Sequence, residues 1–232
     1  SEAMKAVSQH GVSDFHSAVA EGRESRRERI LAAAREALKE RRISEVSLNE
    51  ISRRTDLSRS KIERSFSSRE AIFLELTQRD YGAWVDEVTE AVEADAGADD
   101  PVAELSAVLA SIVRRPLLCE LLGCSSGIFE LKAGVDYAVD YKTAMYGHDN
   151  RLGAAIESRL GPIPERLCTI VVLGLRGMVT ELWAHAHPAR AAEEAVCWDG
   201  GIGPSPESLE EEASQGFAVL LAGVVARLRE TV

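Results

Sequence analysis

Three adjacent polar residues, Arg59, Ser60 and Lys61, have side-chain types that recognise the edges of DNA bases. Arginine and lysine donate hydrogen bonds to the O6 and N7 acceptors of guanine, the commonest specific contact in the major groove. These residues directly follow Ser58, a candidate helix N-cap, and a recognition helix contacts bases from its N-terminal end. We therefore predict that they read DNA sequence. Candidate contacts to the DNA phosphates are Ser47, Arg64 and Arg69.

The stretch that contains these residues has the pattern of two short helices joined by a tight turn. Ser47 and Glu50 have the spacing of a capping box, in which each side chain satisfies a backbone N–H at the start of a helix. Asp56 marks the break, because aspartate tolerates turn and left-handed conformations. Ile62 and Phe66 lie one helical turn apart and are expected to face inward. This is the layout of a helix-turn-helix, although an ordinary three-helix module with a charged face shows the same pattern.

The region from Arg27 to about Phe73 resembles the DNA-binding domain of the tetracycline-repressor (TetR) family of bacterial regulators. The resemblance implies an all-α protein with an N-terminal three-helix helix-turn-helix DNA-binding domain and a C-terminal helical effector-binding and dimerisation domain. It also implies that Ser47 and Arg69 contact phosphates. The segments that agree in order and spacing are Ile30-Leu-Ala-Ala-Ala34, Ser47-Leu-Asn-Glu-Ile-Ser52, Ser58-Arg-Ser-Lys-Ile62 and Phe66-Ser-Ser-Arg-Glu-Ala-Ile72.

Three positions depart from the family's pattern. The family usually has glycine where Asp56 stands, and a small residue, often glycine, where Ser60 stands. It usually has tyrosine where Glu63 stands, and that tyrosine touches a phosphate. Because phosphate repels a carboxylate, Glu63 would remove at least one of the family's usual DNA contacts.

The charge of the chain is unevenly distributed. The formal net charge is −11, which argues against indiscriminate nucleic-acid binding by the whole surface. Residues 23–79 nevertheless carry a net charge of +5, and the remainder of the chain carries −16. This asymmetry suits one DNA-binding face on an acidic body, although charge also fluctuates along any chain.

The composition is that of a helical, soluble protein. Aromatic residues make up 5% of the chain, whereas the strong helix formers alanine, leucine, glutamate and arginine are plentiful. The most apolar stretch, Leu167 to Trp183, contains Arg176 and Glu181, so we expect no membrane span. Residues 1–22 lack the apolar segment of a signal peptide, and we therefore predict a cytoplasmic protein.

Cysteine and histidine spacing indicates no metal site and no cofactor. The four cysteines show no C-x-x-C pair, and reduced thiols in the cytosol are the expectation. His185 and His187 are two residues apart, so they do not share a helix face; placement of a cation at a helix end explains them more simply. No glycine fingerprint or hydrolase motif is present, so we predict no catalytic residues and no enzymatic activity.

The apolar periodicity predicts a series of helices, and the chain is expected to have three parts. A long helix is expected from about residue 69 to 94, followed later by separate helices over residues 127–146 and 150–160. Helices over residues 165–185 and 206–230 are expected to form a homodimer, as the resemblance implies. The expected parts are a flexible arm (1–22), a helix-turn-helix DNA-binding domain (23–70) and a helical ligand-binding and dimerisation domain (71–232).

A small-molecule effector is expected to bind in the helical body. Phe129, Tyr137, Tyr141 and Trp183 are candidates to line a mostly apolar cavity, although aromatic residues at helical spacing more often form plain core. The family usually holds its effector between these helices. The sequence does not identify the effector.

Two functions follow from these observations. The first is a ligand-responsive transcriptional regulator, expected to be a repressor, that binds a palindromic double-stranded DNA operator as a homodimer. The second is a helical dimeric protein that binds or sequesters a small molecule and whose DNA binding is lost or weak, which Glu63 motivates. The operator sequence, and the choice between repression and activation, are not determined by the sequence.

Overall fold

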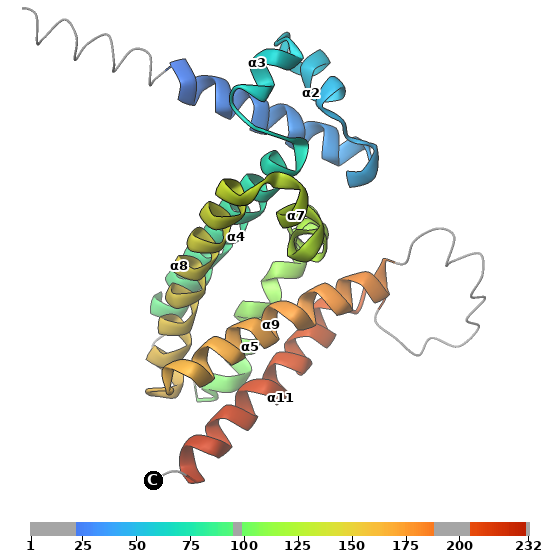
Figure 1. Cartoon of the computed structure of the whole chain (residues 1–232). Coiled ribbons are helices and arrows are strands. Elements are labelled where there is room, and N and C mark those ends of the chain that lie inside the picture. Colours follow the sequence, from blue (N-terminus) through green and yellow to red (C-terminus); the bar gives the residue numbers. More distant parts are fainter. Residues whose placement is uncertain (1–21, 95–98, 188–204, 231–232) are drawn as a thin grey trace, which may run out of the picture.

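A computed structural model of the chain describes residues 22–94, 99–187 and 205–230. Within these ranges the chain forms helices and no strand, which confirms the all-α prediction. Figure 1 shows a small N-terminal domain attached to a larger helical body. Residues 1–21 of the predicted flexible arm lie outside the described ranges.

The N-terminal domain is a compact set of helices around a core of fully buried apolar side chains. Its elements are a first helix over residues 22–40, the 3-10 turn η1 (Ile43–Glu45), α2 (Leu48–Thr55) and α3 (Arg59–Glu63). Ile30, Ile51, Ile62 and Phe66 have no exposed surface. As the pattern predicts, the inward face of α3 holds the domain together and its outer face remains polar.

The helix caps around the turn agree with the prediction in part, but two of the expected side-chain bonds are absent. The Ser47 hydroxyl accepts from the Glu50 backbone N–H at 3.2 Å, and Asp56 has the left-handed conformation with φ of 54°. The second bond of the capping box, from the Ser47 backbone N–H to the Glu50 carboxylate, is absent. The Glu50 carboxylate pairs with Arg53 and Arg54 instead. Ser58 starts α3 without a side-chain cap, and its hydroxyl lies 3.1 Å from the hydroxyl of Ser60.

Helix α4 (Arg69–Ala94) leads from the N-terminal domain through the whole body. Its first turn is capped by Ser68, whose hydroxyl accepts from the Ala71 backbone N–H at 3.1 Å. Helix α8 (Val135–Leu160) lies beside it and runs in the same direction (Figure 1). These two parallel helices form the centre of the body, and other helices pack against them.

The predicted helices over residues 127–146 and 150–160 are wrong in their boundaries. The structure has a π-helical turn, η3 (Ser125–Phe129), a short helix α7 (Glu130–Ala133) and the single long helix α8. Gly134 separates α7 from α8 with φ of 93°, a conformation that favours glycine. Gly147 lies within α8, because one glycine costs a helix only about 1 kcal/mol, which packing against α4 can offset.

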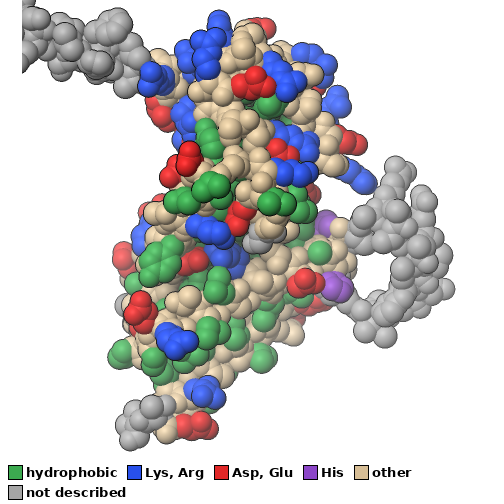
Figure 2. Space-filling view, in the orientation of Figure 1, with side chains coloured by type: hydrophobic (Ala, Val, Ile, Leu, Met, Phe, Trp, Pro, Cys, Tyr) green, Lys and Arg blue, Asp and Glu red, His purple; other side chains and the backbone are tan. Residues whose placement is uncertain are grey.

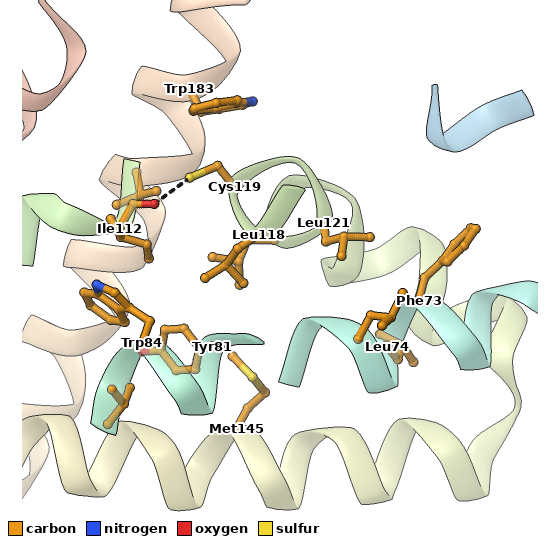
Figure 3. Packing of buried hydrophobic residues seen from close by; sticks show 14 of the residues in the cluster. Phe73, Leu74, Tyr81, Trp84, Ile112, Leu118, Cys119, Leu121, Met145 and Trp183 are labelled. Atoms are coloured by element: carbon orange, nitrogen blue, oxygen red, sulfur yellow. Dashed lines mark hydrogen bonds between the residues drawn. The ribbon is translucent and has the colours of Figure 1, made fainter. Parts of the chain in front are cut away.

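The remaining helices form the rest of the body. They are α5 (Pro101–Ala110), the 3-10 turn η2 (Ser111–Arg114), α6 (Pro116–Cys124), α9 (Glu165–Ala186) and α11 (Leu209–Glu230). Helix α11 packs against α5 and α9. Figure 3 shows side chains from α4, α6 and α8, including Tyr81, Trp84, Leu118 and Met145, meeting in the core between these elements.

Helices α9 and α11 leave large apolar side chains exposed in the single chain. Ile170 and Leu173 on α9 are 63% and 48% exposed, and Val219 on α11 is 77% exposed. Among the described residues, α9 is the one helix long and apolar enough by length and composition to cross a membrane. Core helices of soluble proteins satisfy the same criterion, so the expected absence of a membrane span stays a prediction.

The ion pairs of Glu50 predict a pH-dependent contribution to stability. Hydrogen bonds from Arg53 and then Arg54 lower the pKa of this buried carboxyl to about 2, although burial acts in the opposite direction. A lowered pKa stabilises the folded state above the unfolded value near 4.5, and this stabilisation is lost as the pH falls towards 2. Glu50→Gln is expected to lower the melting temperature at pH 6 by a few degrees.

Thermal unfolding followed by circular dichroism between pH 6 and pH 2.5 measures this effect. The difference between wild type and Glu50→Gln is expected to shrink steadily below about pH 4.5. Glu63→Gln, which removes an exposed ion pair, is the matched control and is expected to change little at any pH. A Glu50→Gln difference that is constant across this range would contradict the assignment.

Candidate functional site

A surface groove brings together the starts of three helices in the N-terminal domain. Ser47 precedes α2, Arg59 begins α3 and Arg69 begins α4, and all three residues line this groove together with Glu63. Three of the six predicted DNA-contacting residues therefore line the same groove. Ser60, Lys61 and Arg64 are exposed on the same short helix or directly after it.

Arg59 is paired with Glu63 one helical turn away. The Arg59 Nε donates to the Glu63 Oε1 at 2.7 Å, and the two side chains are 61% and 41% exposed. Exposed pairs of this kind are worth about 0.3–0.5 kcal/mol, whereas a bidentate arginine–guanine contact contributes roughly 1–3 kcal/mol of discrimination. Arg59 can therefore exchange Glu63 for a base at little cost.

Arg69 has a structural role that the sequence did not reveal. Its Nη1 donates to the backbone carbonyls of Ser44 at 3.1 Å and Val46 at 2.8 Å, and its Nε donates to Glu70 at 2.9 Å. These hydrogen bonds link the segment before α2, at Ser44 and Val46, to the first turn of α4. The predicted phosphate contact of Arg69 stays a prediction, as does that of Arg64, whose Nε donates to the Ser60 carbonyl at 3.3 Å.

Basic side chains gather on the N-terminal domain. Figure 2 shows Lys and Arg side chains over that domain, whereas the face of the body in the same view carries mixed charges and apolar patches. This distribution agrees with the net charge of +5 over residues 23–79. The exposed face of α3 therefore lies in the part of the surface best suited to a polyanion.

Two family models match the chain in sequence. The model described as "Bacterial regulatory proteins, tetR family" matches residues 30–76, and "Tetracyclin repressor-like, C-terminal domain" matches residues 78–228. The chain belongs to the TetR family. It is thus a transcriptional regulator with a helix-turn-helix DNA-binding domain, as the resemblance implied. A comparison with curated proteins finds no match.

Solved structures of TetR-family proteins share this fold. The repressor AlkX from Dietzia sp. strain DQ12-45-1b has a TM-score of 0.53 and 15% identity, over 86% of this chain and 96% of its own. A TetR-family regulator from Streptomyces coelicolor has 0.52 and 19%, over 86% and 99%. The fatty acid degradation regulator FadR from Bacillus halodurans has 0.52 and 14%, over 84% and 98%. At these identities the similarity establishes the fold alone.

Tyr137 lies at the junction between the DNA-binding domain and the body of this TetR-family chain. Its hydroxyl donates to the Ser65 carbonyl at 2.8 Å, and its ring stacks on Phe66 with centroids 6.3 Å apart. Beside it, the Ser67 hydroxyl donates to the Ala133 carbonyl at 2.9 Å. Tyr137 therefore connects the start of α8 to the turn that follows α3.

The other three candidate effector residues are buried side chains. Phe129 is buried with its ring 5.4 Å from that of Phe73, and burial raises the pKa of Tyr141. Trp183 stacks on His187 with centroids 3.9 Å apart. None of the four lines the narrow internal cavity found among the described residues. Their role in effector binding stays a prediction.

The sequence reasoning missed a polar cluster where α4, α8 and α9 meet. The Tyr81 hydroxyl donates to the Asp149 Oδ1 at 2.9 Å, and the Arg176 Nη1 lies 3.0 Å from both oxygens of Asp149. Burial raises the pKa of both Tyr81 and Asp149. The available signal was Arg176 itself, a cation in the middle of the most apolar helix.

The described part of the chain offers no obvious metal site. It contains no group of three or more histidine, cysteine, aspartate or glutamate side chains placed to hold an ion. Cys119, Cys124 and Cys168 are free thiols, and Cys197 lies outside the described ranges. The His187 Nδ1 lies 3.2 Å from the Trp183 carbonyl, and the His185 Nδ1 lies 2.9 Å from the Glu181 carbonyl.

Replacing Glu63 tests whether its charge opposes DNA. Glu63→Gln is expected to raise the affinity for duplex DNA by about two- to fivefold, because it removes a carboxylate beside the predicted phosphate contacts. Fluorescence anisotropy with a mixed-sequence duplex at fixed salt measures the change. Glu90→Gln, at an exposed position on α4, is the control with the same change in net charge. A lower affinity of Glu63→Gln would mean instead that Glu63 positions Arg59.

Proposed function

We propose that this TetR-family regulator is a ligand-responsive repressor that binds a palindromic operator as a homodimer. The observation that carries the proposal is the exposed N-terminal end of α3, where Arg59, Ser60 and Lys61 project from the basic domain. In this reading the domain division is the predicted one, with residues 23–70 binding DNA and the body responding to a cytoplasmic small molecule.

The apolar surface of α9 and α11 supports the homodimer. Ile170, Leu173 and Val219 are large apolar side chains that the single chain leaves exposed. Pairing these two helices, which correspond to the predicted segments 165–185 and 206–230, with those of a second copy would bury this surface in a four-helix bundle. Such a dimer would present two α3 helices to half-sites about 34–36 Å apart.

The contacts between the body and the DNA-binding domain support the ligand response. Helix α4 belongs to both parts, and Tyr137 and Ser67 connect the start of α8 to the segment after α3. A ligand that favours one arrangement of α4 and α8 would therefore change the position of α3. It does so only if it binds one conformation more tightly than the other.

Selection from a random duplex library, followed by anisotropy at several salt concentrations, tests the repressor proposal. We expect a palindromic preference and binding that weakens steeply with salt. Arg59→Ala is expected to cost about 1–3 kcal/mol on the selected duplex and to relax preference at one position of each half-site. Arg114→Ala, an equal loss of charge on the body, is the control. Failure to select any sequence would contradict the proposal and favour the small-molecule-binding alternative.

Replacing Ile170 tests the homodimer separately. Ile170→Asp places a charge in the expected interface, so we expect dissociation to a monomer in sedimentation analysis and a loss of tight operator binding, with helix content retained. Ala83→Asp, at an exposed position on α4, adds the same charge away from the interface and is expected to remain dimeric. A dimeric Ile170→Asp variant would show that the chains associate through another surface.

A further inference from the structure

Five large apolar side chains between residues 128 and 146 are exposed to water. Each has an exposed fraction of at least 55%, and together they form what we call the apolar ridge: Ile128, Leu131, Val135, Val139 and Tyr146. Three further large apolar side chains are exposed in the described part of the chain, and they are those of α9 and α11 named above. A homodimer formed through α9 and α11 alone would therefore leave most of these side chains in water.

The residues beside the ridge are packed firmly into the body. Phe129 is buried, with its ring against that of Phe73. Ala133 is buried as well, and its backbone carbonyl accepts a hydrogen bond from the Ser67 hydroxyl at 2.9 Å. Because these buried neighbours fix the backbone on which the ridge stands, the ridge is a defined surface to which another molecule can be complementary.

One end of the α8 face that carries the ridge is already covered by α9. Val135, Val139 and Tyr146 share this face, because spacings of four and seven residues are close to whole helical turns. The same face continues to Gly153, where an added Cβ would lie 2.6 Å from the Cys168 sulfur of α9. Figure 1 shows α9 starting near the end of α8 and then diverging from it. The chain therefore covers this face near Gly153 and leaves it exposed near Val135.

A groove between α8 and α9 joins the ridge to the exposed side of α9. Tyr146 lines this groove from α8, and Thr169 lines it from α9. Leu173 follows Thr169 by one helical turn and is exposed. In the orientation of Figure 1, Figure 2 shows apolar side chains distributed over the face of the body that includes these helices. The ridge is thus continuous with the surface of the proposed homodimer.

The charge around the ridge suits a second copy of the chain. Residues 128–146 contain two lysines and three carboxylates, a net charge of −1, whereas the chain outside residues 23–79 carries −16. A twofold contact brings identical surfaces together, so a strongly charged surface would repel itself. The nearly neutral ridge avoids this repulsion, and it offers little attraction to a highly charged partner such as a nucleic acid.

We propose that a second copy of this chain covers the apolar ridge, as part of one interface with α9 and α11. This proposal rests on the homodimer proposed above and extends its surface. A copy packed there would contact the segment that carries Tyr137, whose hydroxyl donates to the Ser65 carbonyl in the turn after α3. The dimer contact would therefore extend to the junction with the DNA-binding domain.

A charge placed on the ridge tests the proposal in the full-length protein. Because Leu131 is 84% exposed, we expect Leu131→Asp to keep its helix content in circular dichroism. We expect its dimer dissociation constant in sedimentation analysis to rise tenfold or more, because the contact would bury an unpaired carboxylate. Ala83→Asp, exposed on α4, is the control and is expected to dissociate as the wild type does.

Val135→Asp repeats the measurement at a second exposed position, so the test does not depend on the folding of one variant. We expect the same tenfold or greater rise in the dimer dissociation constant. Dissociation constants of Leu131→Asp and Val135→Asp equal to that of the wild type would overturn the proposal.

Photo-crosslinking of the purified protein identifies what covers the ridge. A phenylalanine analogue that carries a benzophenone is placed at position 131 in one sample and at position 83 in another. Irradiation is expected to produce a covalent dimer from the first sample and none from the second. A sample that is dimeric in sedimentation but yields no covalent dimer from position 131 would show that the second copy does not cover the ridge.

The proposal and the contact through α9 and α11 fail in different ways. If Ile170→Asp dissociates the dimer and the ridge variants do not, the homodimer stands and the ridge is not part of it. If the ridge variants dissociate the dimer and Ile170→Asp does not, the contact through α9 and α11 is wrong while the ridge contact stands. A wild-type protein that is monomeric in sedimentation would overturn both.

Discussion

The packing of α4 against α8 is the constraint on which the rest of this structure depends. Helix α4 starts beside the groove lined by Ser47, Arg59 and Arg69 and extends over 26 residues into the body, so it belongs to both parts of the chain. Helix α8 runs beside it in the same direction. At Gly82 the His148 ring of α8 lies close to α4, because a Cβ there would lie 2.5 Å from that ring. A shift of α8 therefore cannot leave α4 unaffected.

The attachment of the DNA-binding domain depends on a small number of polar bonds around a buried ring. The Arg27 guanidinium lies over the Phe66 ring, 4.1 Å from its centroid, and the ring of Tyr137 also stacks on Phe66. Arg27 also pairs with Glu75 on α4 and donates to the Ser65 carbonyl at 2.6 Å. The turn after α3 is thus held by the first helix, α4 and α8 together. This arrangement gives α3 a defined position relative to the body.

Opposite surfaces of the chain are suited to different partners. The basic domain exposes Arg59, Ser60 and Lys61, whereas α9 and α11 expose apolar side chains that water solvates poorly. Between these surfaces the body places a few charged side chains in apolar surroundings. Burying Arg176 and Asp149 is unfavourable unless each finds a partner, and here the two side chains pair with each other and Asp149 also accepts from Tyr81.

The sequence by itself determined the helical class, the helix-turn-helix and its polar outer face, because helical periodicity and capping residues such as Ser47 act within a few neighbouring positions. Boundaries that depend on packing, such as the uninterrupted α8 across Gly147, could not be predicted in this way. Only the tertiary structure decided that Tyr137 joins the two parts and that Tyr81, Asp149 and Arg176 meet. The reason is physical: these contacts link residues 27 to 72 positions apart, and their geometry is set by how whole helices pack.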